Sequence, residues 1–368
     1  MDKKWFAIII LMLLIPITLI SFAIINNQVS AKSSPNTTLE ECNTLKNNGE
    51  GSTNLVFIGS KELSEKYMDF FLSTSPFKEN KGEFNFYYID SYEPKCDLYK
   101  GIAILCYSKE LIKKASSCPN DYTIVLENEQ SRIRSSSYMN VMSINTQHPM
   151  SVLTHEFGHA YINLAEEYVP AKIPAGSENC VNECDKFNSE TNGCFTECSE
   201  SSYVRSIESG VMRTLSSNSY GIYNENLILK KLNSQKSTLI TGKAISNQEN
   251  CNEQEYYLIE ANYKNNEISL IDKSLEDGCI GDTGQGIFNY NLIKNNQEII
   301  HGTSFNPELI FTDAVGIEYI DGETFNNEGN FLLKVPVIPS SKSLSILQDD
   351  NELISIDLTD VGVRACKI

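Results

Sequence analysis

The sequence predicts an α/β domain followed by an all-β domain. In residues 54–240, short apolar segments alternate with segments of helical periodicity, which is typical of an α/β domain. In residues 241–368, short strand-like segments alternate with Asn, Gly and Asp, which predicts a sandwich-like all-β domain. A length of 368 residues suits two modest domains, each with its own core.

The elements of the first domain follow from the spacing of its apolar residues. Strands are expected in four short apolar segments, at residues 55–59, 84–89, 122–126 and 138–144. Helices are expected at residues 61–72 and 99–115, with a third beginning near Pro149. In the second domain, strands are expected at residues 256–263, 267–271, 286–293 and 331–337.

The N-terminus predicts export. Residues 5–25 form a nearly unbroken apolar run, long enough as a helix to cross a hydrocarbon core of about 30 Å. Because Lys3 and Lys4 precede it, residues 1–31 are expected to form a cytoplasmic tip and a single-pass signal anchor in the cell membrane. The alternative is a signal peptide cleaved after residues 29–31, which gives a secreted protein. Residues 32–53 are polar and aperiodic and predict a flexible stalk.

Charge and cysteine content are consistent with an extracellular location. The formal net charge of −18 disfavours nucleic acid, which needs a basic surface. Outside the cell, the 11 cysteines are expected to form disulfides, with at least one thiol left over. Cys42 and Cys366 are candidates for the leftover thiol, or they pair with each other. Cys251 and Cys279 are expected to pair within the β domain.

Two Cys-x-x-x-Cys pairs lie close together in the first domain. One interpretation of their four thiolates is a structural zinc site; the other is a loop closed by disulfides. Disulfides are favoured because thiolates oxidise outside the cell. If both segments are helical, the expected pairing is crossed, Cys180 with Cys198 and Cys184 with Cys194.

The chemistry of the chain is concentrated in the segment His155-Glu156-Phe157-Gly158-His159. On a helix, histidines four residues apart lie on one face, so both imidazoles can bind one tetrahedral zinc ion. Glu156 lies beside the metal, where it can accept a proton from a zinc-activated water and pass it to the leaving amine. The other two histidines, His148 and His301, are poorly placed as a third ligand.

The third ligand is therefore expected to be a carboxylate. Glu166 and Glu167 follow His159 by seven and eight residues, roughly 10–12 Å along a continuous helix and too far to share its metal. The helix must end and the chain must turn back, and Asn163 best tolerates the left-handed conformation of such a stop. Glu166 is favoured as the ligand, and Glu167 is the alternative.

This segment resembles the H-E-F-G-H-x-x-x-x-L-A-D-E-Y signature of the IgA-peptidase family of metzincin-like zinc metallopeptidases. Here the signature continues as Leu164-Ala165-Glu166-Glu167-Tyr168, with Glu166 in place of the usual Asp and Asn163 in place of a common Gly. The resemblance spans about residues 54–235 and implies a mixed sheet and an active-site helix. It also implies a Met-turn with Met212 beneath the metal, and a tyrosine such as Tyr220 or Tyr223 that supports the reaction. A structural role is the alternative for all three residues.

The predicted function is thus a zinc-dependent endopeptidase that hydrolyses extracellular proteins or peptides, without immunoglobulin being implied as the substrate. His155, His159 and Glu166 would hold Zn²⁺, and Glu156 would be the general base. The alternative is a non-catalytic surface protein that binds its partners through the C-terminal β domain.

Overall fold

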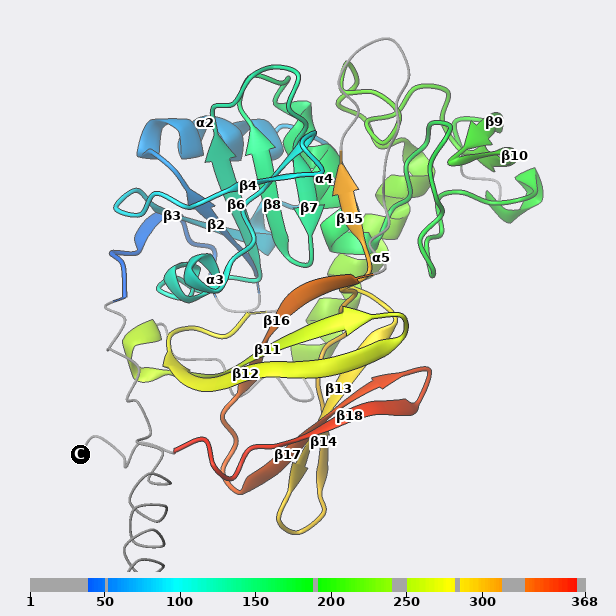
Figure 1. Cartoon of the computed structure of the whole chain (residues 1–368). Coiled ribbons are helices and arrows are strands. Elements are labelled where there is room, and N and C mark those ends of the chain that lie inside the picture. Colours follow the sequence, from blue (N-terminus) through cyan, green and yellow to red (C-terminus); the bar gives the residue numbers. More distant parts are fainter. Residues whose placement is uncertain are drawn as a thin grey trace, which may run out of the picture. The chain divides into compact units, whose positions relative to one another are not determined.

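The computed structural model describes residues 39–49, 52–187, 191–239, 250–281, 285–312 and 328–362. Residues from Leu39 onward form one compact unit. The chain is mixed α/β, with four α-helices in the described ranges, one mixed sheet and further β-sheets (Figure 1).

A seven-stranded mixed sheet lies at the centre of the N-terminal half. Its strand order is β1-β3-β2-β6-β8-β7-β15, with β3, β2, β6 and β8 parallel and β1, β7 and β15 antiparallel to their neighbours. The strands are β1 (Asn43–Lys46), β2 (Thr53–Ile58), β3 (Phe84–Ile89), β6 (Tyr122–Glu127), β7 (Ser136–Tyr138), β8 (Val141–Asn145) and β15 (Ile310–Thr312).

Most of the expected elements of this half are confirmed, with two corrections. The segment expected as one strand at residues 138–144 is a hairpin of β7 and β8, because Met139 adopts φ 55° and turns the chain. The helix expected at residues 99–115 begins only at α3 (Lys109–Ala115). Before it, β4 (Asp97–Tyr99) and β5 (Ala103–Leu105) form a small hairpin with a turn at Lys100 and Gly101.

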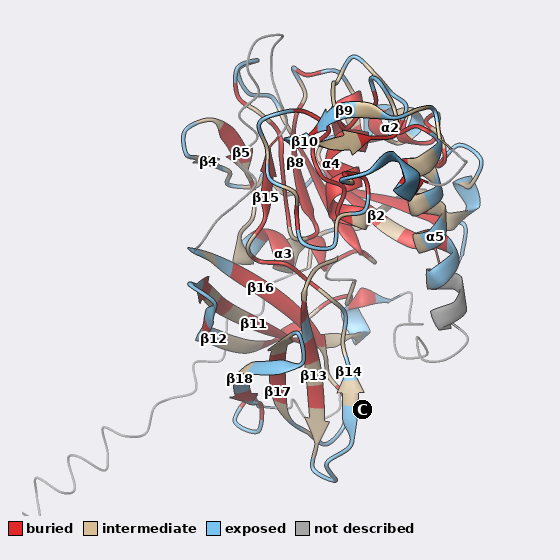
Figure 2. Ribbon diagram, turned by 90° about the vertical axis from the view of Figure 1, so that its right-hand side faces the viewer, coloured by how far each residue is buried: buried red, intermediate tan, exposed pale blue. Residues whose placement is uncertain are grey.

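One face of the sheet is covered by α2 (Lys61–Phe71) and α4 (Ser151–Ile162), and α5 (Ile222–Leu239) packs against α4. Alternate residues of the strands, such as Leu55 and Phe57, point into this core. Phe157 of α4 lies at its centre, with its ring packed against those of Phe71 and Phe77. Figure 2 shows α4 as buried, so the predicted active-site helix is an internal element of the domain.

Two antiparallel sheets make up the C-terminal half and share a second hydrophobic core. The first contains β12 (Glu267–Asp277), β11 (Glu255–Lys264) and β16 (Glu328–Pro336). The second contains β14 (Ile299–His301), β13 (Phe288–Lys294), β17 (Ser341–Gln348) and β18 (Asn351–Asp357). All four strands expected in this half are present, and β12 is longer than expected.

The two halves share a third core on the other face of the mixed sheet. There Val56 and Val125 of the sheet pack with Leu111 of α3 and with Leu258 and Leu332 of β11 and β16. The buried Lys334 of β16 also crosses this boundary, and its ammonium donates to Asn120 Oδ1 at 2.6 Å and Ser116 Oγ at 3.3 Å. The halves are therefore joined by apolar packing as well as by the polypeptide.

The described chain begins within the stretch expected to be a stalk. Strand β1 pairs with β3, and Cys42 forms a disulfide with Cys118 of the domain. The expectation that Cys42 is unpaired or pairs with Cys366 is therefore wrong, and Cys366 lies outside the described residues. The boundary expected at residues 240–241 falls among residues 240–249, which are not described, and stays a prediction.

The expected transmembrane helix requires a correction. Crossing a bilayer takes about 20 predominantly apolar residues. Across the ranges given above, no helix is long and apolar enough to do so. The longest, α5, has 18 residues and carries Glu225, Lys230 and Lys231. Residues 5–25, on which the prediction fell, lie outside the described residues.

Candidate metal centre

Helix α4 and its C-terminal stop position the two histidines. His155 and His159 lie one turn apart on α4, and both are buried. The helix ends at Asn163, which has φ 57° and ψ 39°, so the predicted left-handed stop is confirmed. The backbone N–H of Asn163 donates to His159 O at 3.0 Å, and its side-chain amide donates to Ala175 O at 2.9 Å. These bonds hold the chain in the turn that follows the helix.

The turn brings Glu166 back to the histidines. Its Oε1 lies 3.1 Å from His159 Nε2, and its Oε2 lies 3.4 Å from His155 Nε2. The two Nε2 atoms are themselves 3.1 Å apart, and the three ligand atoms all lie within 4.8 Å of one another. Two nitrogens bound to one tetrahedral zinc at about 2.0–2.1 Å are roughly 3.3 Å apart, so this spacing fits the ion.

The imidazole tautomers also fit a metal. Nδ1 of His155 lies 2.8 Å from Val211 O, and Nδ1 of His159 lies 2.6 Å from Leu164 O. Because a carbonyl oxygen only accepts, both Nδ1 atoms carry protons, so each Nε2 atom can offer its lone pair to a metal ion once any proton on it is released. Backbone carbonyls that orient ligating histidines in this way are usual in metal sites.

The pKa shifts of His155, His159 and Glu166 indicate that the two imidazoles share one positive charge. Burial favours the uncharged form of His155, but Glu166 outweighs it and raises the pKa of His155 to about 10. For His159, burial prevails and the pKa is lowered. Burial likewise opposes ionisation of Glu166, yet the two imidazoles lower its pKa to about 2. The ionised carboxylate of Glu166 is thus paired with the charged imidazole of His155.

Glu156 is the remaining acidic group of the motif. Its carboxylate is fully buried and is not part of the three-ligand cluster. It is near enough to His155 to contribute to the raised pKa of that imidazole. Glu156 therefore lies close enough to His155 to influence its charge without belonging to the three-residue cluster.

Glu167 lies in a separate network. Its Oε1 accepts hydrogen bonds from Asn224 Nδ2 at 2.8 Å and from Asn179 Nδ2 at 3.2 Å. Its backbone N–H donates to Met212 O at 2.9 Å, and Arg213 donates to its backbone carbonyl at 2.7 Å. Burial raises the pKa of Glu167 to about 7. The structure thus gathers Glu166, not Glu167, with the two histidines.

The turn at residues 211–213 supports the centre from below. Val211 O accepts a hydrogen bond from His155 Nδ1–H. Met212 is fully buried in the core between the mixed sheet and the helices. A Cβ atom on Gly158 would lie 2.8 Å from Met212 Sδ, so the glycine of the motif allows the methionine to approach the helix. Met212 therefore packs against α4 at Gly158, and its role as a Met-turn stays a prediction.

The other candidate side chains lie elsewhere. Tyr220 is buried and its hydroxyl donates to Thr154 O, and the Tyr223 ring packs against Phe187, so both make structural contacts. His148 Nε2 lies 3.0 Å from Ser131 O. The exposed His301 on β14 contacts Asn291. Neither histidine is in the metal-binding cluster found among the described residues.

A cysteine-rich loop, residues 180–198, follows Glu166 in the sequence. The crossed disulfides Cys180–Cys198 and Cys184–Cys194 are both present, which confirms the pairing and excludes a four-thiolate zinc site there. The helical condition attached to that pairing is not met, because Cys198 ends strand β9 (Phe195–Cys198) and only Cys184 is in a short 3-10 helix. Cys251–Cys279 is also confirmed, and Cys96 pairs with Cys106.

Sequence reasoning missed Phe311. Its ring is parallel to that of His159, with centroids 4.0 Å apart and an interplanar angle of 11°. The apolar run Leu309-Ile310-Phe311 signals a buried segment, but its pairing with β7 joins residues about 170 positions apart and has no local signal. Asn179 and Asn224, which donate to Glu167, were also missed, because the direction of the Glu167 side chain has no signal in the spacing.

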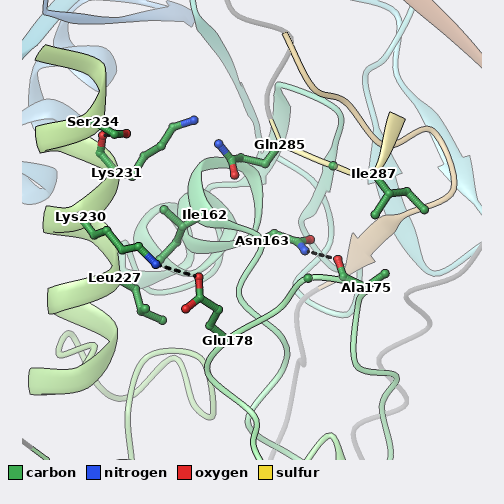
Figure 3. A pocket seen from close by; sticks show the side chains of 12 residues that line it. Ile162, Asn163, Ala175, Glu178, Leu227, Lys230, Lys231, Ser234, Gln285 and Ile287 are labelled. Atoms are coloured by element: carbon green, nitrogen blue, oxygen red, sulfur yellow. Dashed lines mark hydrogen bonds and ion pairs between the residues drawn. The ribbon is translucent and has the colours of Figure 1, made fainter. Parts of the chain in front are cut away.

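A cavity of about 360 Å³ lies beyond the C-terminal end of α4 (Figure 3). It is lined by Ile162 and Asn163, by Leu227 and Lys230 of α5, and by Ile287. None of the three metal ligands lines it. Its position therefore does not open the metal centre to solvent.

Comparison of the chain with protein-family models and with curated proteins finds no match.

Proposed function

We propose that the protein is a zinc-dependent endopeptidase related to the metzincin-like IgA-peptidase family. The observation that carries the proposal is the convergence of His155 Nε2, His159 Nε2 and a Glu166 carboxylate in a buried cluster. Glu156 is close enough to this cluster to raise the pKa of His155. Two imidazoles and one carboxylate are a usual ligand set of catalytic zinc.

The residues of the site have separate roles in hydrolysis. His155, His159 and Glu166 bind zinc, and the carbonyls of Val211 and Leu164 hold the two rings in the ligating tautomer. The bound ion supplies a Lewis acid that polarises the scissile carbonyl and lowers the pKa of water. Glu156 accepts the proton of the attacking water on a carboxylate oxygen and delivers it to the amine nitrogen that leaves.

The disulfides support a location outside the cytoplasm. Ten cysteines form five disulfides among the described residues. Such bonds persist in oxidising compartments and are rare in the cytosol. The substrate class that follows is an extracellular protein or peptide.

Metal analysis combined with peptide-library digestion tests the proposal. The wild-type chain should bind one zinc ion per molecule and cleave peptides, and His159→Ala should lose both properties. Glu156→Gln should keep the zinc and lose cleavage by about 10²–10⁴-fold. Glu62→Gln, at an exposed position on α2, is the matched control.

A wild-type protein without zinc and without cleavage contradicts the proposal. Zinc binding with no cleavage of any peptide or unfolded protein favours a binding module instead.

A further inference from the structure

The metal centre is closed to solvent in the folded chain. His155 and His159 are each 2% exposed, and Glu156 and Glu166 are 0% exposed. Hydrolysis needs room at the same place for an extended peptide and for a water molecule. Some part of the chain must therefore move before a substrate can reach these residues.

Strand β15 lies against one of these residues. Phe311 at its centre stacks on the imidazole of His159. The strand pairs antiparallel with β7, with Phe311 opposite Ser137 and Thr312 opposite Ser136, and it contacts α4 (Figure 1). Without β15, β7 would be the edge strand of the mixed sheet beside the metal helix.

This strand is a short edge strand of the mixed sheet. It has three residues and comes from the C-terminal half, whose other strands belong to different sheets. It has β7 as its one strand neighbour within the described ranges. The Thr312 hydroxyl is buried and finds no hydrogen-bond partner among the described residues, which costs free energy in the closed state.

We propose that β15 is a built-in inhibitory strand that covers the metal centre, and that an extended polypeptide must displace it from β7 before it can be cleaved. The inference rests on the proposed peptidase function. Displacement uncovers the His159 ring and frees a sheet edge, and extended peptides bind such edges through main-chain hydrogen bonds. The opposite role for Phe311 is a permanent wall of the substrate site, and the two roles predict opposite effects of removing the ring.

The first experiment removes the stacking ring. Phe311→Ala is compared with the wild type in the rate at which dipicolinate strips zinc and in the rate of peptide cleavage. If the open state is a minor species of about 0.1–10%, uncovering the centre should raise both rates by about tenfold or more. Phe305→Ala is the control, because Phe305 is an equally buried phenylalanine that packs on Phe288 and Phe331 in the second core.

The second experiment fastens the strand instead of loosening it. Ser136→Cys with Thr312→Cys places two cysteines opposite each other across β7 and β15, a separation that a disulfide can span. In the oxidised double variant, both the rate of zinc removal by dipicolinate and the rate of peptide cleavage should be at least about tenfold lower than in the single variant Ser136→Cys under identical conditions. Cleavage at the same rate by both overturns the proposal.

The outcomes separate this inference from the proposed function. If Phe311→Ala binds zinc but is stripped and cleaves no faster than the wild type, or if Phe305→Ala is accelerated equally, the inhibitory strand is refuted while the peptidase stands. A fall in cleavage by zinc-loaded Phe311→Ala also refutes it and makes Phe311 a wall of the site. A chain that binds no zinc refutes both proposals.

Discussion

Met212 Sδ lies 2.8 Å from the position that a Cβ atom on Gly158 would occupy. Tyr220 and Leu164 approach the same position to 3.1 and 3.2 Å. The helix that carries His155 and His159 is therefore packed closely against the turn at residues 211–213, at the position of Gly158. The smallest residue of the motif determines how closely the two ligand-supporting segments pack.

Gly158→Ala should destabilise the protein, although alanine is the better helix former. Alanine in place of glycine within a helix ordinarily stabilises by about 0.5–1 kcal/mol. Here the added methyl group overpacks the contact with Met212, which costs about 1–3 kcal/mol. Denaturant unfolding measures the difference. Gly82→Ala, where a Cβ meets nothing within 4 Å, should be close to neutral, and a Gly158→Ala chain as stable as the wild type would refute the contact.

A comparison of Glu166→Gln with Glu167→Gln should show which of the two carboxylates binds the metal and which one holds the surrounding chain in place. Glu166→Gln removes a ligand charge from the cluster and should lower zinc affinity by more than about 100-fold. Glu167→Gln keeps an acceptor for Asn179 and Asn224 and should change affinity by about tenfold or less. Competition with a chelator of known affinity gives both values. The opposite ranking would make Glu167 the ligand.

The two disulfides of the cysteine-rich loop should differ in importance. Cys180 and Cys198 are buried beside Ala165, and Cys180 Sγ lies 3.6 Å from Glu166 O. Replacing both with Ser should cost about 3 kcal/mol, as expected for a loop of that size, and should weaken zinc binding. Cys184 and Cys194 are exposed. Their double replacement, the matched control, should leave zinc affinity nearly unchanged, and equal losses of affinity would contradict this assignment.

Lys334 should make stability depend on pH. Burial lowers the pKa of Lys334 to about 7, whereas an unfolded lysine titrates near 10.4. Between these values the unfolded chain binds more protons, so this group makes the free energy of unfolding rise with pH, by up to about 4 kcal/mol.

Unfolding of Lys334→Met over pH 6 to 10 measures the contribution of Lys334. The variant leaves Asn120 Oδ1 without its donor, so its stability at one pH is not diagnostic. Its stability relative to the wild type should instead fall as pH rises. Lys61→Met, at a side chain 62% exposed, should run parallel to the wild type. A parallel curve for Lys334→Met would show that Lys334 stays charged.

The sequence predicted the local features of the site and missed the distant ones. The helix and its stop at Asn163 follow from spacing and backbone preference within about 20 residues, whereas the crossed disulfides are present without the two helices on which their prediction depended. The choice between Glu166 and Glu167 depends on side-chain directions after a left-handed turn, which composition does not encode. Phe311 and the Cys42–Cys118 bond depend on contacts between distant segments. Alternation of apolar residues predicts a buried strand but not its neighbour.

The core shared by β11, β16 and the mixed sheet has a consequence for engineering and for evolution. A chain truncated after α5 would expose Val56, Val125 and Leu111 to water, because Leu258 and Leu332 would no longer cover them. The N-terminal half is therefore not expected to fold as an independent domain. Recombination that exchanges the C-terminal half must preserve the apolar residues of this shared core, so the two halves are expected to be inherited together.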